Sequence, residues 1–571
     1  MKATAVAFLL IATTCTTPAA AADAAIKVTT VMMPTRDGTR LQTNIYRAGE
    51  STKPLPVLLL KTAYDTKNFD AQARRVASRG FIAVTQDSSG RFGSGGEFNL
   101  YWGEPPDGFD TVMWIKEQSW CDGHVGMWGH SYMGSVQWLT ASTGASVDAL
   151  APSASVAYFY DNIYRGGAYI LALGRAGFGA NVYGPPPSAG SSPEWSKWYL
   201  TLPLMNLDDV VGHEAPLQMS MIKHTTPNGF WRGTDARNFE DMDFPAQHIV
   251  GYYDFMCPGA VSAWHGMRTR SASKHSRNNQ QLILGPWDHA TGSTRAGDVD
   301  FGKAANLDML AENLVWYDRW FKQIHRDKPY PRVRYFVMGD NTWREASDWP
   351  PRQARPTRFF LDSGGQANTR HGNGQLKRSA PNTKQPADKF VADPANPVPN
   401  APAHGRKYVD GFGPYDQQTA QDRKDVLVYR MPPHSKPLTF AGRLTAELFV
   451  SANTPDADFV VTVVDVHPDG FCHPLATGIQ RASARESLAD RKSLRPDKTY
   501  RLTIDIGHCA ATIRPGHQLC VQIQASHFPV YARNTNTGEG PFSAKTLVAT
   551  QRVYHDVERA SHVLLPILDR R

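Results

Sequence analysis

Short hydrophobic runs alternate with helix-like segments over residues 26–157, and this alternation constrains the fold more than any other feature of the chain. The runs PVLLLKTAY, FIAVTQD and HVGMWGHS have the length and composition of strands, and FDTVMWIKEQSW has the spacing of an amphipathic helix. Alternating strands and helices predict a parallel sheet with helices on both faces. The alternation returns over residues 246–334. These two ranges are therefore predicted to form one α/β core in two parts.

Two other regions have different patterns. Residues 158–245 lose the strand signal and mix aromatic residues with YGPPPSAGSSPEW, which predicts an inserted helical cap with a loop. Over residues 335–571, Pro- and Gly-rich turns separate runs such as DFVVTVVDV and YRLTIDI, whose two-residue period is typical of antiparallel strands. Many short strands without helices predict a C-terminal β-sandwich of the jelly-roll type.

The first 22 residues have the features of a secretory signal peptide. Lys2 precedes an apolar stretch, and an Ala-rich end offers a cleavage site near Ala22. Cys15 would suit a lipid anchor, but Thr14 before it is a poor fit to such a site. No stretch reaches the roughly 18 apolar residues that a membrane-spanning helix needs. The sequence therefore predicts an exported protein, periplasmic or secreted, without a membrane span.

Charge and cysteine content narrow the function classes. The formal net charge is +8, but the basic residues are scattered, and their one cluster at residues 267–277 is interpreted as a solvated face rather than a nucleic-acid site. Five cysteines follow the signal peptide, of which Cys509 and Cys520 are the favoured disulfide pair in an oxidising compartment. The alternative is that all five are buried small hydrophobes. The oligomeric state, monomer or homo-oligomer, stays open.

The segment GMWGHSYMGS places Ser131 between a predicted strand and a predicted helix. Gly129 stands two residues before it and Gly134 three residues after it. A strand-to-helix elbow with small neighbours holds a serine in a strained turn and exposes its Oγ above the sheet. The helix N-terminus adds the backbone N–H of Tyr132, which could donate to a developing oxyanion. Met133 departs from the usual elbow, which has glycine two residues after the serine.

A nucleophilic serine needs a base and an orienting carboxylate, which in such folds follow later strands in the order Ser, Asp, His. The strand HIVGYYD ends at Asp254, and LILGPWDH ends at His289. Asp288 is the competing carboxylate, but it is the direct neighbour of His289. Adjacent residues at the end of a strand point to opposite sides, so Asp288 is not expected to orient His289. His130, next to the serine, is rejected as the base for the same reason. The predicted catalytic residues are therefore Ser131, Asp254 and His289.

Several further motifs give the chain a resemblance to a known family. They are RDGTRLQTNIYR (36–47), KTAYDTK (61–67), QDSSGRFGSGGEF (86–98), DGFDTVMWI (107–115), WCDGHVGMWGHSYMG (120–134), GYYD, GPWDH, WREASDWPP (343–351) and DPANPVP (393–399). With these motifs the chain resembles the CocE/NonD hydrolases, which include cocaine esterases, α-amino-acid ester hydrolases and S15 X-Pro dipeptidyl-peptidases. The resemblance implies an α/β-hydrolase core and covers nearly all of the chain after residue 22.

The resemblance also bears on the site residues. The family's elbow is Gly-x-Ser-Tyr-x-Gly, so Met133 is no longer an exception, and Ser131, His289 and Asp254 correspond to its nucleophile, base and acid. A family tyrosine that donates to the oxyanion corresponds to Tyr64 in KTAYDTK, with Ala63 in place of the family's proline. Tyr64 and the N–H of Tyr132 would then form the oxyanion hole.

The substrate is less well defined by the sequence. α-Amino-acid ester hydrolases carry acidic residues just after the triad aspartate, whereas this chain has Phe255, Met256 and Cys257 there. An unpaired substrate ammonium would be costly in such a pocket, which disfavours α-amino esters. An acyl pocket bounded by Trp287, Phe255, Tyr158 and Tyr160 is expected to suit a neutral or aromatic ester. X-Pro dipeptidyl-peptidase and α-amino-acid ester hydrolase or acyltransferase activities are the alternatives.

Two other kinds of function are less favoured by the sequence. The β domain could make the chain a carbohydrate-binding protein with an inactive hydrolase core, but all four catalytic side chains are present. The stretch DVHPDGFCHP offers His467, Cys472 and His473 as metal ligands, but their spacing matches no established cluster, and a surface hairpin is favoured. Acyl transfer through a serine needs no cofactor, so none is expected. The expected partner is a small-molecule ester or amide.

Overall fold

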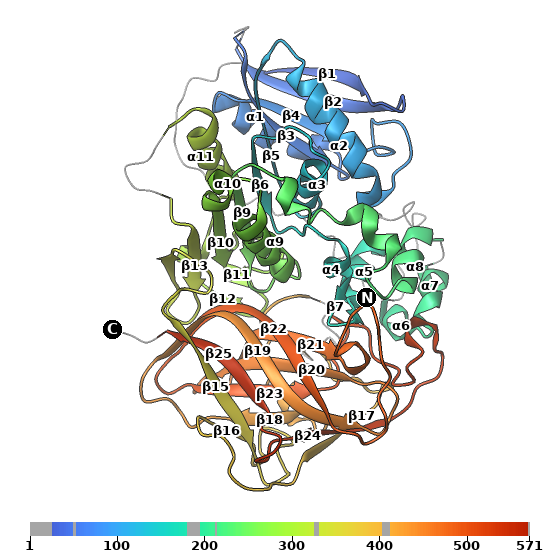
Figure 1. Ribbon diagram of the computed structural model, residues 1–571, viewed down its shortest axis with the longest axis vertical. Coiled ribbons are helices and arrows are strands. Elements are labelled where there is room, and N and C mark those ends of the chain that lie inside the picture. Colours follow the sequence, from blue (N-terminus) through green and yellow to red (C-terminus); the bar gives the residue numbers. More distant parts are fainter. Residues whose placement is uncertain are drawn as a thin grey trace, which may run out of the picture.

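The computed structural model describes residues 26–49, 53–179, 195–211, 214–324, 330–401 and 411–568. The predicted signal peptide at residues 1–22 and most of the cap loop at 183–195 lie outside these ranges. Figure 1 shows an α/β unit at one end of the molecule and an all-β domain at the other, with the cap helices beside the junction. Within the described ranges, no helix is long and apolar enough to cross a membrane.

One ten-stranded sheet organises the α/β unit, in the order β1-β2-β4-β3-β5-β6-β9-β10-β13-β14. The seven strands from β4 to β13 pair in parallel, and β1, β2 and β14 add antiparallel edges. The strands are β1 Ile26–Pro34, β2 Arg40–Ala48, β3 Leu55–Thr62, β4 Ile82–Asp87, β5 Cys121–His130, β6 Ala149–Ser153, β9 Ala246–Gly251, β10 Gln280–Gly285, β13 Val333–Val337 and β14 Thr342–Ala346. The predicted boundary at residue 334 is therefore too early, because β13 pairs with β10 and carries the sheet to Ala346.

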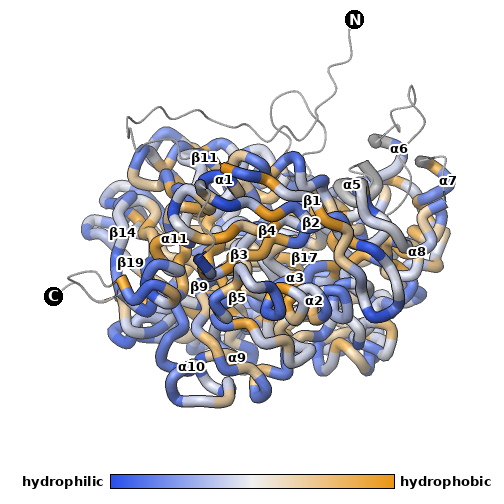
Figure 2. Tube along the Cα trace, turned by 90° about the horizontal axis from the view of Figure 1, so that it is seen from above, coloured by the Kyte–Doolittle hydropathy of each residue, from blue (hydrophilic) through white to orange (hydrophobic). Residues whose placement is uncertain are grey.

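Helices cover both faces of this sheet, as the alternating pattern predicts. Figure 2 shows α1 and α11 on one side of the hydrophobic strands and α2, α3 and α9 on the other. The helices are α1 Asp70–Ser78, α2 Leu100–Lys116, α3 Tyr132–Ala141, α9 Cys257–Arg270, α10 Lys274–Asn278 and α11 Met309–Phe321. Gly126 of β5 lets α11 pack closely, since a Cβ there would lie 2.4 Å from the ring of Tyr317.

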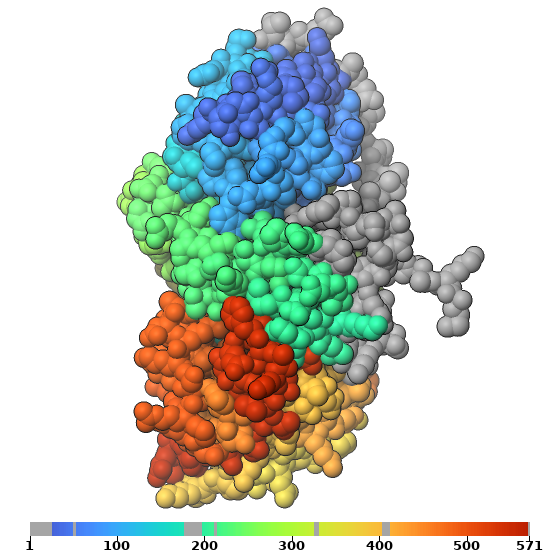
Figure 3. All heavy atoms as spheres, turned by 90° about the vertical axis from the view of Figure 1, so that its right-hand side faces the viewer, coloured from blue at the N-terminus to red at the C-terminus, as the bar shows by residue number. Residues whose placement is uncertain are grey.

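The inserted cap is mainly helical but also contains a small hairpin. Its helices are α4 Tyr160–Ile163, α5 Leu171–Gly179, α6 Trp195–Leu200, α7 Leu207–Val211 and α8 Pro216–Lys223, and its hairpin consists of β7 Tyr164–Arg165 and β8 Ala168–Tyr169. Buried aromatic rings hold it together, with Tyr160 stacked on Tyr164 and both against Trp231. Figure 3 shows the cap, in green, between the blue α/β unit and the red and orange β domain.

The C-terminal domain is all-β, as predicted. Its strands are β15 Ala354–Asp362, β16 Gln375–Lys377, β17 Asp388–Ala392, β18 Leu427–Arg430, β19 Leu438–Ala452, β20 Asp458–Val466, β21 Cys472–Arg481, β22 Tyr500–Ile513, β23 Gln518–Gln524, β24 Ala549–Tyr554 and β25 His562–Leu568. A shared apolar core joins it to the α/β unit, because Val333 and Phe336 of β13 pack in the same cluster as Leu444 and Ile506.

The favoured disulfide between Cys509 and Cys520 is not formed. Cys509 lies in the large shared core, whereas Cys520 lies in a separate apolar cluster beside Cys472. All five cysteines of the described ranges are free thiols, and four of them are buried. These four cysteines therefore fit the alternative prediction, in which cysteines are buried small hydrophobic residues.

Candidate active site

Ser131 lies at the sharp turn where β5 ends and α3 begins. Its backbone has φ 62° and ψ −120°, a conformation that side-chain-bearing residues rarely adopt and that costs about 1–3 kcal/mol. The turn is held by the Ser131 N–H, which donates to the carbonyl oxygen of Ser153 at 2.9 Å. The strain therefore resides at the one residue whose hydroxyl projects from the elbow.

A different close approach requires glycine at each of the two positions that flank Ser131. Gly129 has φ +145°, and a Cβ there would lie 2.5 Å from the Cβ of Met133. A Cβ on Gly134 would lie 2.6 Å from the carbonyl oxygen of Ser153, the same atom that holds the Ser131 N–H. Met133 itself is buried in the core beneath the elbow. The close approaches thus require glycine at 129 and 134, and Met133 is accommodated.

The three residues predicted as catalytic lie in one hydrogen-bonded chain. The Nε2 of His289 lies 2.8 Å from the Oγ of Ser131, and its Nδ1 lies 2.9 Å from Asp254 Oδ2. The other oxygen of Asp254 accepts the backbone N–H of Met256 at 2.8 Å. Asp254 follows β9 and His289 follows β10, which are neighbouring parallel strands, so their carboxyl ends meet above the sheet.

Burial and charge set the protonation of this pair. Burial by itself raises the pKa of the Asp254 carboxyl, but His289 and the Met256 N–H outweigh it, and the pKa lies below its ordinary value. Burial likewise lowers the pKa of His289, while the charge and hydrogen bond of Asp254 raise it more, so that it lies above its ordinary value. The carboxylate is therefore ionised and makes the imidazole a stronger base.

The two rejected neighbours are engaged differently. Asp288 accepts the backbone N–H of Ala290 at 2.9 Å, and burial raises its pKa. The ring of His130 lies 4.7 Å from that of His289, measured between centroids. Burial and the nearby His289 lower the pKa of His130 to about 3, so this ring is neutral near pH 7 and adds no charge beside His289.

Two groups close to Ser131 in the chain or in the structure are candidate donors. Tyr64 follows β3, burial raises the pKa of its phenol to about 12, and the nearby side chain of Ser131 lowers that pKa by less. The phenol therefore keeps its proton and can donate it. Tyr132 is the first residue of α3, so its N–H belongs to the first turn, where no intrahelical acceptor exists. The N–H of Tyr132 is therefore available as a donor.

The sequence analysis missed a buried polar network beneath the elbow. The phenol of Tyr132 donates to Glu104 Oε1 at 2.6 Å, and Glu104 lies 3.4 Å from the Nζ of Lys61, both carboxylate and ammonium being almost fully buried. Glu104 belongs to α2 and Lys61 to β3, so the network ties these two elements to the first residue after Ser131. Charged residues inside a hydrophobic strand and helix were the only sequence signal for it.

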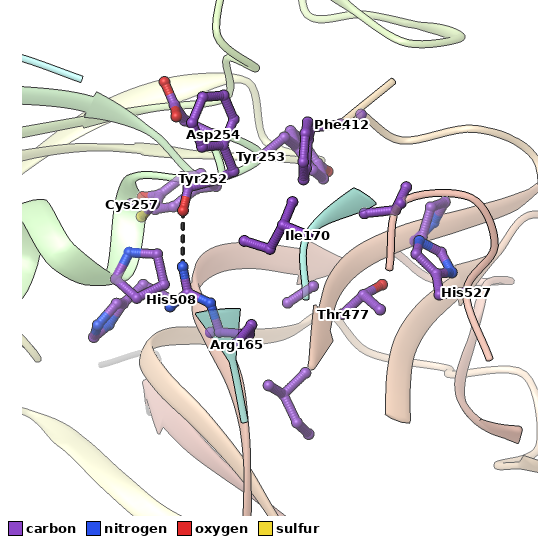
Figure 4. Close-up of a pocket in the computed structure, with 18 of the residues that line it drawn as sticks. Arg165, Ile170, Tyr252, Tyr253, Asp254, Cys257, Phe412, Thr477, His508 and His527 are labelled. Atoms are coloured by element: carbon purple, nitrogen blue, oxygen red, sulfur yellow. Dashed lines mark hydrogen bonds between the residues drawn. The ribbon is translucent and has the colours of Figure 1, made fainter. Parts of the chain in front are cut away.

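A cavity lies below Asp254 where the α/β unit, the cap hairpin and the β domain meet (Figure 4). Asp254 and Phe255 line it, whereas Ser131 and His289 are not among its described lining residues. The ring of Phe255 lies 4.7 Å from His289 and 4.9 Å from Phe412 of the β domain. Arg165 of the hairpin donates to the carbonyl oxygen of Phe255 at 2.8 Å, which holds this loop in place. Phe412 was not predicted from the sequence.

Three of the four residues predicted to bind substrate are buried in the structure, namely Trp287, Tyr160 and Tyr158. Trp287 is fully buried, and its indole N–H donates to the carbonyl oxygen of Ala305 at 2.8 Å, so it packs behind the His289 loop. Tyr160 is 1% exposed, with its phenol bonded to the carbonyl oxygen of Thr225. Tyr158 is 5% exposed under the guanidinium of Arg237. Of the four, only Phe255 lies against the catalytic histidine.

Comparisons with known proteins agree with this architecture. Residues 37–291 match the X-Pro dipeptidyl-peptidase (S15 family) model, and residues 325–564 match the X-Pro dipeptidyl-peptidase C-terminal non-catalytic domain. Cocaine esterase from Rhodococcus sp. (strain MB1 Bresler) is 34% identical over 577 residues, covering 95% of this chain and 98% of that protein.

Solved structures show the same fold over the whole chain. An α-amino acid ester hydrolase superposes with a TM-score of 0.82 at 24% identity, covering 99% of this chain and 100% of that one. An aminopeptidase from the marine sediment archaeon Thaumarchaeota archaeon also has a TM-score of 0.82 at 24% identity, with coverage of 95% and 97%. The length and identity of the match to cocaine esterase show that this chain belongs to the CocE and S15 family of serine hydrolases.

Proposed function

We propose that this protein hydrolyses carboxylic esters through an acyl-enzyme on Ser131, with His289 as general base and Asp254 as the residue that orients it. The observation that carries the proposal is the continuous hydrogen-bonded chain from Ser131 Oγ through both nitrogens of His289 to Asp254. Such a chain activates a serine that is unreactive at its free pKa. Its placement on a strained strand-to-helix turn supports the same role.

The first half-reaction forms the acyl-enzyme. Ser131 transfers its hydroxyl proton to Nε2 of His289 as Oγ attacks the ester carbonyl carbon, and the carbonyl oxygen becomes negative. Tyr64 O–H and Tyr132 N–H donate to that oxygen. The carbon–oxygen bond to the alcohol then breaks, and His289 returns the proton to the leaving alkoxide.

Water completes the cycle by the same steps. It gives its proton to His289 and attacks the acyl carbon, after which Ser131 leaves with the returned proton and the carboxylic acid is released. Ser131 Oγ and His289 Nε2, between which the first proton transfer passes, already lie within hydrogen-bond distance of each other.

A neutral, aromatic or otherwise apolar acyl group suits the surroundings best. The ring of Phe255 packs against His289 and against Phe412, and no carboxylate follows Asp254 in the next three positions. Asp505, which also lines the cavity, is paired with Arg443 at 3.0 Å. A substrate ammonium would therefore lack an unpaired carboxylate near the loop. The name of its relative, cocaine esterase, agrees with an ester substrate.

Export is part of the same proposal. Lys2, the apolar stretch after it and the Ala-rich end at Ala22 are those of a cleaved signal peptide. N-terminal sequencing of the protein recovered from periplasm and medium tests this point. A chain that keeps residues 1–22 in the cytoplasm would contradict it.

The decisive experiment compares two substrates with one control variant. We expect the purified protein to hydrolyse a short-chain aryl ester, Ser131→Ala to lose that activity, and an Xaa-Pro anilide to stay uncleaved. Efficient cleavage of the anilide would instead show an X-Pro dipeptidyl-peptidase, which is what the matching family model is named for. Full ester turnover by Ser131→Ala would overturn the assignment of the nucleophile.

A further inference from the structure

Three potential metal ligands converge in the β domain, where β20 ends and β23 begins. One ligand atom each from Asp465, His467 and His517 lies within 4.8 Å of the other two. The Nδ1 of His517 lies 3.0 Å from Asp465 Oδ1, and the Nε2 of His467 lies 3.5 Å from Asp465 Oδ2. The two imidazole rings are 4.5 Å apart between centroids.

Strand register brings these residues together. In the antiparallel pairing of β20 with β23, Asp465 lies opposite Leu519 and Val466 opposite Gln518. Continued by one step, the same register places His467 opposite His517, although 50 residues separate them in the sequence. Directly opposed residues of antiparallel strands have side chains about 4.5–5.5 Å apart at Cβ, so the two rings meet without distortion. The cluster is therefore a product of the sheet and not of one loop.

Two of the three metal ligands that the sequence suggested do not belong to this cluster. Cys472 is buried in an apolar cluster with Val464 and Val466, so its thiol points into the core. His473 lies opposite Asp465 on β21, but its Nε2 is 3.0 Å from the phenol oxygen of Tyr253 in the α/β unit. Asp465 and His517, which a search of the stretch DVHPDGFCHP alone does not consider together, join His467 instead.

We propose that Asp465, His467 and His517 bind one divalent transition-metal ion, with Zn²⁺ as the best fit. Two imidazoles and one carboxylate are a donor set that Zn²⁺ uses with a water as fourth ligand. Tetrahedral Zn²⁺ with bonds of about 2.0–2.1 Å separates neighbouring ligand atoms by roughly 3.3 Å. The separations of 3.0 and 3.5 Å around Asp465 lie on either side of that value, so small side-chain rotations suffice.

Exposure allows an ion to enter and leaves room for the water. The side chains of Asp465, His517 and His467 are 5%, 14% and 28% exposed, so the carboxylate forms the floor and the imidazoles the rim. Without an ion, the Nδ1–H of His517 donates to Asp465. An ion bound to Nδ1 displaces this proton, and a neutral His517 then carries it on Nε2 instead.

The proposed ion would be bound by residues of two different turns and would connect them. His467 begins the turn that links β20 to β21, and His517 ends the turn that links β22 to β23. Among the described contacts, neither residue touches Ser131 or His289, so we expect the metal to stabilise the β domain and to take no part in ester hydrolysis. The site is independent of the proposed function.

The test is a Zn²⁺ titration by isothermal calorimetry of the tag-free full chain after chelator treatment. We expect one Zn²⁺ per chain with micromolar or tighter affinity and a higher Tm on binding. His517→Ala and His467→Ala should each weaken binding at least about tenfold, a loss similar to that caused by disturbing other metal sites. Near-UV circular dichroism of each variant checks that it is folded. Substitution with Co²⁺ gives a second readout through its visible absorption.

Two controls distinguish this site from others. His124 lies 3.2 Å from Asp122 in an exposed pair without a third ligand, so His124→Ala should leave Zn²⁺ binding unchanged. His289→Ala removes the close His–Asp pair at the candidate active site, and it too should leave binding unchanged. Absence of stoichiometric binding would overturn the proposal. So would binding that survives His517→Ala and disappears in His289→Ala.

Discussion

The Nε2 of His289 lies 2.8 Å from the Oγ of Ser131, although 158 residues separate the two in the chain. Ser131 follows β5 and His289 follows β10, and the intervening segment contains the whole cap. The parallel sheet places both strand ends on the same edge, which is why two distant loops can share one hydrogen bond. The predictions below test what this contact and its surroundings do.

Asp254 and Asp288 form a natural pair of test and control. Asp254→Asn should lower kcat by about 10⁴-fold with little change in stability, because an amide cannot stabilise the imidazolium and favours the wrong tautomer. Asp288→Asn should change kcat by less than a few-fold, since Asp288 bonds only its own turn among the described contacts. Steady-state kinetics on an aryl ester measure both. Equal losses in the two variants would contradict the assignment of Asp254.

The pH profile of kcat/KM should show one acid limb from His289. Its imidazole must be neutral to accept the serine proton, so activity falls as pH drops through its pKa. Because Asp254 raises that pKa, the limb should lie above 6.5, the ordinary value for histidine. His130→Gln should leave the limb nearly in place, as His130 has a pKa of about 3. A limb well below 6.5 in the wild type would argue against a charged Asp254 beside the base.

Tyr64→Phe should keep the fold and lose part of the transition-state stabilisation. The substitution removes only the hydroxyl group of Tyr64, whose phenol interacts with the side chain of Ser131. Loss of one oxyanion donor costs about 10²- to 10³-fold in kcat, with KM changed much less. Thermal unfolding serves as the control and should show an unchanged Tm. An unchanged kcat would remove Tyr64 from the oxyanion hole.

Substitution of glycine by alanine is expected to have opposite effects on stability at two positions. Gly134→Ala places a Cβ 2.6 Å from the carbonyl oxygen of Ser153, so it should destabilise the protein by about 1–3 kcal/mol and reduce activity. Gly103→Ala in α2 meets only the Asn99 side chain at 3.8 Å and should stabilise by up to about 1 kcal/mol through helix propensity. Denaturant unfolding measures both. Tolerance of Gly134→Ala would mean that the elbow can shift.

Local pattern was enough to identify the α/β unit and the reactive strand ends. Strand and helix periods are properties of consecutive residues, so β5, β9 and β10 could be located from the sequence, and with them Ser131, Asp254 and His289. The end of the unit was placed too early, because β13 is recognisable only by its pairing with β10. Strand pairing depends on partners distant in sequence, and a local period carries no information about them.

Side-chain surroundings were decided by the tertiary structure. The sequence showed that Trp287 and Tyr160 are large aromatic residues, but only the packing of separate elements shows that both are almost fully buried. It showed His467 within one hairpin, whereas the partner His517 comes from another strand through the register of β20 and β23. Burial and proximity depend on how separate elements pack, which no single stretch of sequence specifies. Residue types and local periods thus came from the sequence alone, and the tertiary structure decided which of these residues meet.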